Sequence, residues 1–161
     1  MKGKKLGFLI WPVLLVLALL LAGAAGGLGA EEEPAAEEIL AEAEAGIEAL
    51  EATAAVKERL RTMARTWLRD GERAGLTGNQ LRELVQAMVR VGVNCDPVRE
   101  RLRLRSVCKL MVQEMKEGGS AEEIANQICT RLAAGETLAQ AVRNLTREMT
   151  EAKKGQTTTQ N

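Results

Sequence analysis

The sequence predicts an all-α protein, a small bundle of about five helices with a long N-terminal helix after an export segment. Apolar residues recur at helical spacing in every segment after residue 35, and three capping-box patterns each follow a glycine-containing break. No stretch alternates apolar and polar residues with the β-branched enrichment of a strand. These observations favour two repeated helical hairpins followed by a closing helix.

Residues 1–30 have the organisation of a signal peptide. Lys2, Lys4 and Lys5 precede an uncharged apolar run, which ends in an Ala- and Gly-rich stretch suited to cleavage. The charge-free stretch is also long enough to span a bilayer, so an uncleaved membrane anchor is the alternative. In both cases the lysines stay inside and residues 31–161 cross the membrane, so the expected location is periplasmic or extracellular.

Residues 31–55 are predicted to form an acidic, Ala- and Glu-rich helical arm. Residues 31–51 contain nine Glu and no basic residue, whereas residues 52–161 carry 19 basic and 13 acidic side chains. Helix-forming residues dominate from Ala35 to about Arg69, so one long helix is expected there. Its first half presents a thin, mostly Ala seam, which buries little area and is typical of a helix that docks on a partner.

The bundle is predicted to occupy residues 56–151. After a break at residues 70–76, Thr77 with Gln80 forms the first capping box. The helix that follows carries apolar residues at intervals of three and four, a spacing that faces a core, and ends at Gly92.

A third helix is expected to begin at Asp96, as the N-cap, and Pro97, and to run to about Glu117. The residues 152–161 are polar and are predicted to be a disordered tail. Two further capping boxes begin the fourth and fifth helices, namely Ser120 with Glu123 and Thr137 with Gln140.

The bundle sequence contains an internal repeat. Residues 56–61 recur as residues 98–103, and the apolar positions, glycines and caps of residues 56–92 coincide with those of residues 98–135. A duplicated hairpin explains this agreement. Two copies are too few for a free-standing solenoid, so the hairpins are expected to pack on each other. The alternative is that two amphipathic hairpins of this length are alike by composition.

Export to an oxidising compartment makes the three cysteines informative. Cys108 and Cys129 each lie ten residues from the Gly118-Gly119 turn, so they are expected at the same height on adjacent helices and are predicted to form a disulfide. Two buried free thiols are the alternative. Cys95 is then left as a free thiol or as an intermolecular cross-link.

Two rows of basic residues at intervals of four follow helix faces, and like charges at this spacing repel unless an anion meets them. The expected anion is the acidic arm of the same or a neighbouring molecule, or an anionic surface such as lipid head groups. A solvated basic face is the alternative. The rows are Lys57, Arg61, Arg65 and Arg69, followed by Arg101, Arg105 and Lys109.

The composition excludes several function classes. The chain has no His, so Ser-His-Asp and Cys-His nucleophile systems and imidazole metal ligands are ruled out. We expect no enzyme activity, cofactor or metal site. Trp67 is the one aromatic residue outside the first 30, so bases have no stacking platform and nucleic acid is not an expected partner.

Residues 76–80, Leu-Thr-Gly-Asn-Gln, resemble the L-T-x-x-Q motif of small periplasmic helical chaperones of the Spy type. The resemblance implies binding of unfolded proteins on a helical face. Those chaperones carry the motif twice, whereas this sequence carries it once. The sequence therefore predicts a non-catalytic extracytoplasmic module for protein interaction or structure, through self-association or another protein. The chaperone is the alternative, and a binder of an anionic envelope surface comes third.

Overall fold

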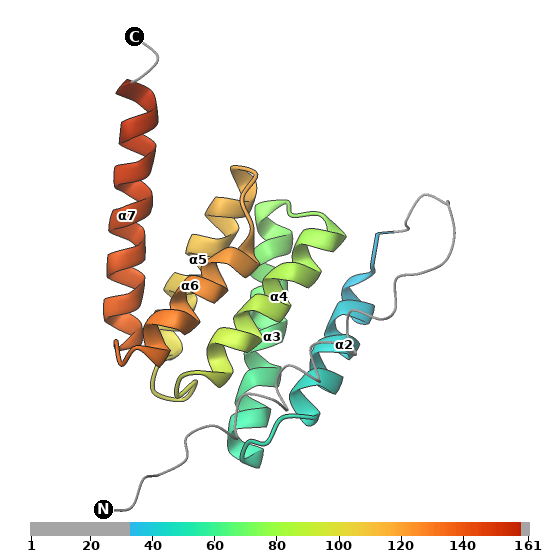
Figure 1. The fold of residues 1–161 in the computed structure, drawn as a ribbon. Helices are drawn as coiled ribbons and strands as arrows, with labels where there is room; N and C mark the ends of the chain where they lie inside the picture. The colour runs from blue at the N-terminus through green and yellow to red at the C-terminus, as the bar shows by residue number, and fades with distance from the viewer. Residues whose placement is uncertain (1–32, 159–161) are drawn as a thin grey trace, which may run out of the picture. The chain divides into compact units, whose positions relative to one another are not determined.

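The computed structural model describes residues 33–158, and within this range it contains six α-helices and no strand (Figure 1). The predicted all-α bundle is confirmed, with one helix more than expected. Residues 1–30, the predicted export segment, lie outside the described part. No helix within the described part is both long and apolar enough to cross a membrane. The helices are α2 (Ala36–Glu48), α3 (Ala54–Ala74), α4 (Gly78–Val93), α5 (Arg101–Lys116), α6 (Ala121–Ala133) and α7 (Leu138–Thr158).

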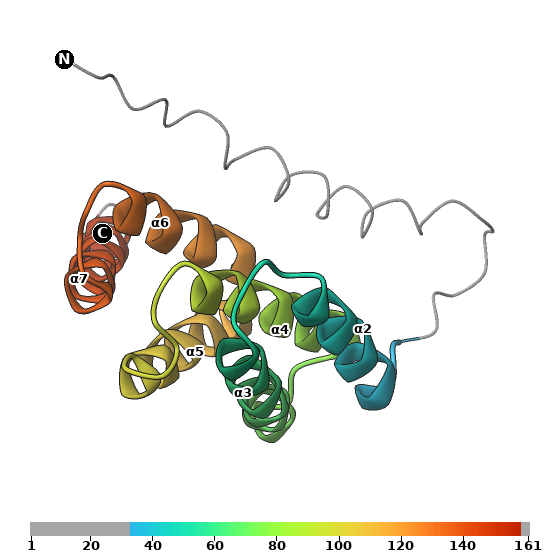
Figure 2. The ribbon, with the colours of Figure 1, turned by 90° about the horizontal axis from the view of Figure 1, so that it is seen from below.

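The additional helix arises because the long N-terminal helix is interrupted. Residues 49–53 separate α2 from α3, so the single helix expected over residues 35–69 is wrong. Thr53 begins the new helix, since its hydroxyl accepts a hydrogen bond from the backbone N–H of Val56 at 3.4 Å. The interruption lets α2 lie against α3 and α4 (Figure 2). The apolar seam of α2 is buried in this contact.

The break between α3 and α4 is shorter than predicted, because α3 continues through Gly71 to Ala74. A Cβ atom at Gly71 would lie 2.6 Å from Cδ2 of Leu81, so glycine at this position allows α3 and α4 to approach closely. The helix ends at Gly75, whose φ of 79° is a left-handed conformation that favours glycine.

The third predicted helix begins later than expected. The Asp96 carboxylate accepts hydrogen bonds from the backbone N–H groups of Val98 at 3.0 Å and Arg99 at 3.3 Å. These bonds close a turn rather than a helix, and α5 starts only at Arg101. The predicted start at Asp96 is therefore wrong.

α4 is the central helix of the bundle and packs against α2, α3, α5 and α6 (Figure 2). α7 packs against α5 and α6 and runs on to Thr158, into the segment predicted to be a disordered tail. All six helices contribute to one hydrophobic core. The core side chains of α4 include Leu81, Leu84, Val85, Met88 and Val91.

Candidate functional site

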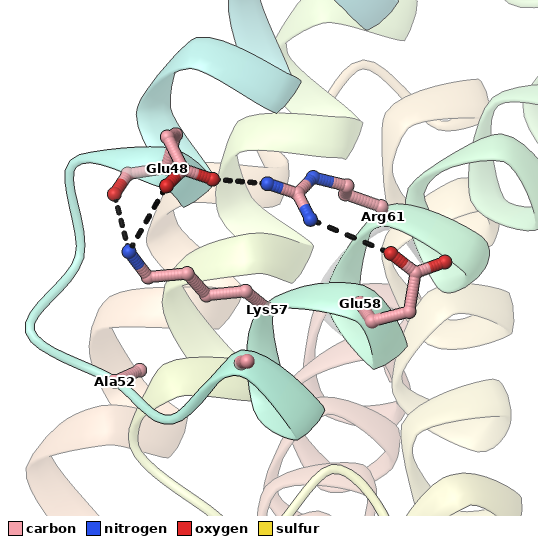
Figure 3. Close-up of a pocket in the computed structure, with 6 residues that line it drawn as sticks. Glu48, Ala52, Lys57, Glu58 and Arg61 are labelled. Carbon is pink, nitrogen blue, oxygen red and sulfur yellow. Dashed lines mark hydrogen bonds and ion pairs between the residues drawn. The ribbon is translucent and has the colours of Figure 1, made fainter.

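The first basic row lies along α3 and faces the acidic helix α2. Glu48 contacts both Lys57 and Arg61, and its backbone carbonyl also accepts a hydrogen bond from the Lys57 ammonium group (Figure 3). One turn earlier in α2, Glu44 meets Arg65 with an N···O distance of 2.6 Å. Three members of this row therefore pair with the acidic arm of the same chain.

These groups surround a shallow pocket at the junction of α2 and α3, which Figure 3 shows in close-up. Arg61 also lies 3.4 Å from the carboxylate of Glu58, which lines the same pocket. Every charged group in the lining is therefore paired with another one. Because no charge in this pocket is left over, its electrostatics stabilise α2 rather than attract a ligand.

A second group of ion pairs attaches α2 to α4, and the basic rows did not predict it. Arg82 of α4 donates to the carboxylates of Glu38 and Glu42, with N···O distances of 3.2 and 3.1 Å. Arg82 belongs to neither row, and about forty residues separate it from its partners. No local sequence signal identifies such a contact.

The apolar seam contributes more to the docking of α2 than its ion pairs do. Ile39 and Ile47 are 2% and 0% exposed, and burial of each is worth roughly 1.5–3 kcal/mol. The ion pairs of α2 join exposed or half-buried side chains at the surface, and surface pairs contribute roughly 0.2–1 kcal/mol each. The thin seam predicted for an external partner is thus used within the chain, and the charges set its orientation.

The second basic row has a different environment. Arg101, Arg105 and Lys109 are exposed along α5 and form no ion pair with another described residue. Leu102 stands on the same outward face and is 78% exposed, and Val98 in the preceding turn is 56% exposed. Exposed apolar and basic side chains therefore lie together at the start of α5.

The contrast with the first hairpin has a structural cause. Leu60 occupies the position of Leu102 in the repeat, yet it is fully buried. It packs closely against Gly92 of α4, where an added Cβ atom would lie 2.7 Å from the Cδ2 atom of Leu60. In the second hairpin the Asp96 turn replaces the first helical turn, so Leu102 lies at the N-terminal end of α5.

A groove of about 430 Å³ separates α3 from α5. Asp70 and Ala74 line it from α3, and six residues of α5 line the other side. Three of its side chains are cationic, and Asp70 is the one carboxylate among them. The lining residues of α5 are Arg105, Cys108, Lys109, Val112, Gln113 and Lys116.

The described residues contain no disulfide, and all three cysteines are free thiols. The predicted Cys108–Cys129 bond is absent because Cys108 faces α3, where it lines the groove beside Asp70. Cys129 instead lies near Arg90 and Cys95. Equal height on adjacent helices did not determine which face of each helix the sulfur occupies.

The thiols are poor candidates for chemistry at neutral pH. Burial, with a smaller contribution from the Asp70 carboxylate, raises the pKa of Cys108 to about 12. Burial also raises the pKa of Cys95 to about 12, assisted by Glu100, Asp96 and Cys129. A protonated thiol is neither a good nucleophile nor a metal ligand. Within residues 33–158, no cluster of Cys, Asp and Glu is arranged to hold a metal ion.

Glu83 and Ser120 form a close acid–hydroxyl pair, in which the hydroxyl donates to the carboxylate at 2.6 Å. The same carboxylate accepts from the backbone N–H of Glu122 at 3.1 Å. Ser120 also accepts from the first turn of α6, so the two residues together cap that helix. The pair is structural. The predicted cap at Ser120 is present, but the carboxylate bonded to it is Glu83 of α4, whereas the Glu123 side chain predicted to complete the capping box accepts from Gln127.

The residues that resemble the chaperone motif also form a helix cap. The backbone N–H of Thr77 donates to the Gln80 side chain at 3.0 Å, and the N–H of Gln80 donates to the Thr77 hydroxyl at 3.4 Å. Leu76, the first letter of the motif, is buried in the core. Helix capping and core packing therefore account for these positions.

Comparison with known proteins gave no match: no protein-family model matches the sequence, and no curated protein or solved structure is significantly similar. Function is therefore inferred from the geometry of the surface.

Proposed function

We propose that this protein is a non-catalytic helical module that binds another protein outside the cytoplasmic membrane. The observation that carries the proposal is the outward face of α5, where Arg101, Arg105 and Lys109 lie beside exposed Leu102. Apolar residues mixed with arginine are typical of protein interfaces. The export segment predicted in residues 1–30 supports the location.

Catalysis has little support. The chain has no imidazole, the thiols are held protonated by burial, and the close Glu83–Ser120 pair caps a helix. A reaction would need an activated nucleophile or an acid–base pair in a cleft. The groove beside α5 offers cations, one carboxylate and a protonated thiol, a set suited to binding an anionic surface.

The experiment is capture of partners from an envelope fraction with residues 31–161 as bait. We expect a partner that is retained by the wild-type chain and lost from the double charge reversal R105E/K109E. The matched control is R143E/R147E, which reverses two exposed arginines on α7 and should retain the partner. A set of captured proteins that is identical for all three baits would contradict the proposal.

A small helical chaperone is the second function that the sequence predicts. The motif behind it is explained by the cap at Thr77 and Gln80, so the structure adds no observation in its favour. Suppression of the aggregation of an unrelated unfolded protein at equimolar ratio would support the chaperone, and aggregation at an unchanged rate would remove it.

A further inference from the structure

We infer that the groove between α3 and α5 binds an acidic amphipathic helix of a partner protein, of the Ala- and Glu-rich kind that α2 represents. The inference rests on the proposed function and specifies its partner. α3 has two flanks, and Figure 2 shows α2 along one of them and α5 along the other. The first flank shows what kind of helix the surface accepts.

On the first flank, an acidic helix already covers a basic row. Glu44 and Glu48 of α2 meet Lys57, Arg61 and Arg65 of α3, while a narrow apolar seam packs inward. The charges repeat about once per helical turn on both partners. Recognition there therefore needs only glutamates at intervals of four beside a seam of Ala and Ile.

On the second flank, no carboxylate within residues 33–158 forms an ion pair with Arg105, Lys109 or Lys116. Arg105, Lys109 and Lys116 line the groove, and Asp70 is the single carboxylate opposite them. The part of α5 that lines the groove runs from Arg105 to Lys116, about 17 Å at 1.5 Å per residue, which is close to the length of α2. A helix of about three turns with one acidic face matches both the length and the charge.

Apolar side chains lie beside the basic residues of this surface. Leu102 and Val98 stand exposed where the row begins, and Val112 and Ala74 lie in the lining of the groove. A partner helix with an Ala-rich seam would cover these side chains as α2 covers its own seat. Two carboxylates of the neighbouring helices are engaged elsewhere, since Glu148 of α7 pairs with Arg131 and Glu114 of α5 pairs with Lys153.

The test uses a fluorescein-labelled peptide of residues 33–50, the chain's own acidic helix, as the probe. Its binding to residues 31–161 is followed by fluorescence anisotropy. We expect saturable binding that weakens with salt and weakens about tenfold or more in R105E/K109E. Binding should be unchanged in R143E/R147E. Circular dichroism of each variant checks that the bundle is intact.

Three outcomes would overturn the inference. Binding that is lost in R61E/R65E but kept in R105E/K109E would mean that the peptide displaces α2 from its own seat. Equal binding of a scrambled peptide of the same composition would mean attraction without a helix. Absence of peptide binding together with co-sedimentation of the protein on phosphatidylglycerol vesicles, lost in R105E/K109E, would assign the face to an anionic membrane.

The proposed function is tested separately. A partner captured in an R105E/K109E-dependent way that the peptide does not displace would leave the proposed function standing and remove the groove. Peptide binding without any such captured partner would have the opposite effect, because the groove would be real and its natural occupant would not be an envelope protein.

Discussion

Gly46 and Gly71 both lie inside helices, yet a methyl group would meet different surroundings at the two positions. At Gly71 the added Cβ atom would lie 2.6 Å from Leu81 and 3.0 Å from Leu84. Both leucines are buried, so neither has room to move aside. At Gly46 no heavy atom lies within 4 Å, so only the backbone entropy of glycine changes.

We therefore expect Gly71→Ala to lower the free energy of unfolding by about 1–3 kcal/mol through overpacking. Gly46→Ala should raise it by about 0.5–1 kcal/mol, because alanine restricts the unfolded chain. Urea unfolding followed by circular dichroism measures both changes. Equal stability of the two variants would show that α3 and α4 are not in close contact at Gly71.

A second residue-scale prediction concerns Glu83, which connects α4 to the start of α6. Removal of its carboxylate in Glu83→Ala leaves the Ser120 cap without its partner and should cost about 1–2 kcal/mol of stability. Glu83→Gln keeps an oxygen acceptor at the same place, so its cost should be smaller. If both variants unfold at the wild-type urea concentration, the carboxylate does not stabilise α6.

The thiols should react only when the protein unfolds. With pKa values of about 12 for Cys95 and Cys108, the thiolate fraction in the folded protein at pH 8 is about a thousandfold below that of an unfolded thiol. Ellman's reagent should therefore react slowly with the native protein and titrate three thiols in urea without reductant. A single titratable thiol in urea would reveal a disulfide and contradict the free cysteines.

The same pKa values determine how stability depends on pH. Between about pH 8.5 and pH 12 the unfolded chain loses thiol protons that the folded chain keeps. The contribution of the buried thiols to stability is therefore complete below about pH 8.5 and is lost as the pH rises toward 12. A variant with Cys95→Ala and Cys108→Ala should show a weaker decline over this range.

At the scale of elements, two substitutions distinguish how much ion pairs and apolar burial each contribute to the stability of α2. Ile47→Ala removes a fully buried side chain and should destabilise the protein by about 2–4 kcal/mol. Arg65→Gln breaks an ion pair between exposed groups and should cost less than about 1 kcal/mol. Hydrogen exchange of the α2 amides, compared between the variants, measures both effects. A larger loss of protection in Arg65→Gln would reverse this order.

The sequence predicts helix existence better than helix ends. Caps read from Thr77 and Ser120 lie where the structure has them, because a cap is a local event within four residues. The helix start predicted at Asp96 was wrong for the same reason, because an aspartate accepts hydrogen bonds from the amides of a turn as readily as from those of a helix. The interruption at Thr53 was missed because its neighbours favour helix, and tertiary packing of α2 decided the outcome.

At the scale of the whole molecule, the sequence predicted the pairing of the acidic arm with the first basic row only as one of several alternatives, and it identified no individual contact between distant residues. Glu83 with Ser120 and Arg82 with Glu42 join elements about forty residues apart, and only the fold brings them together. The open face of α5 belongs to the same category. Its basic residues were identified from spacing, whereas the difference between a covered row on α3 and an open row on α5 came from the structure.

A single core around α4 predicts cooperative unfolding. Trp67 is the only tryptophan in residues 31–161 and lies buried in the first hairpin, so its fluorescence reports that hairpin alone. Helix content by circular dichroism reports both hairpins. The two signals should change together in urea, because α4 shares its apolar surface with both hairpins. An earlier fluorescence transition would show two independent hairpins.

Pro34 presses against Gly78, where a Cβ atom would lie 2.7 Å from the proline carbonyl oxygen, and Gly78 donates its N–H to Glu33 at 3.4 Å. Residues 33–34 therefore pack closely against the first turn of α4, just before α2 begins. If the signal peptide predicted in residues 1–30 is cleaved, a cut at any bond up to residue 30 would leave these contacts intact. A cut a few bonds further along would remove Glu33 and Pro34 together with their contacts to Gly78, and α2 would lose this attachment to α4.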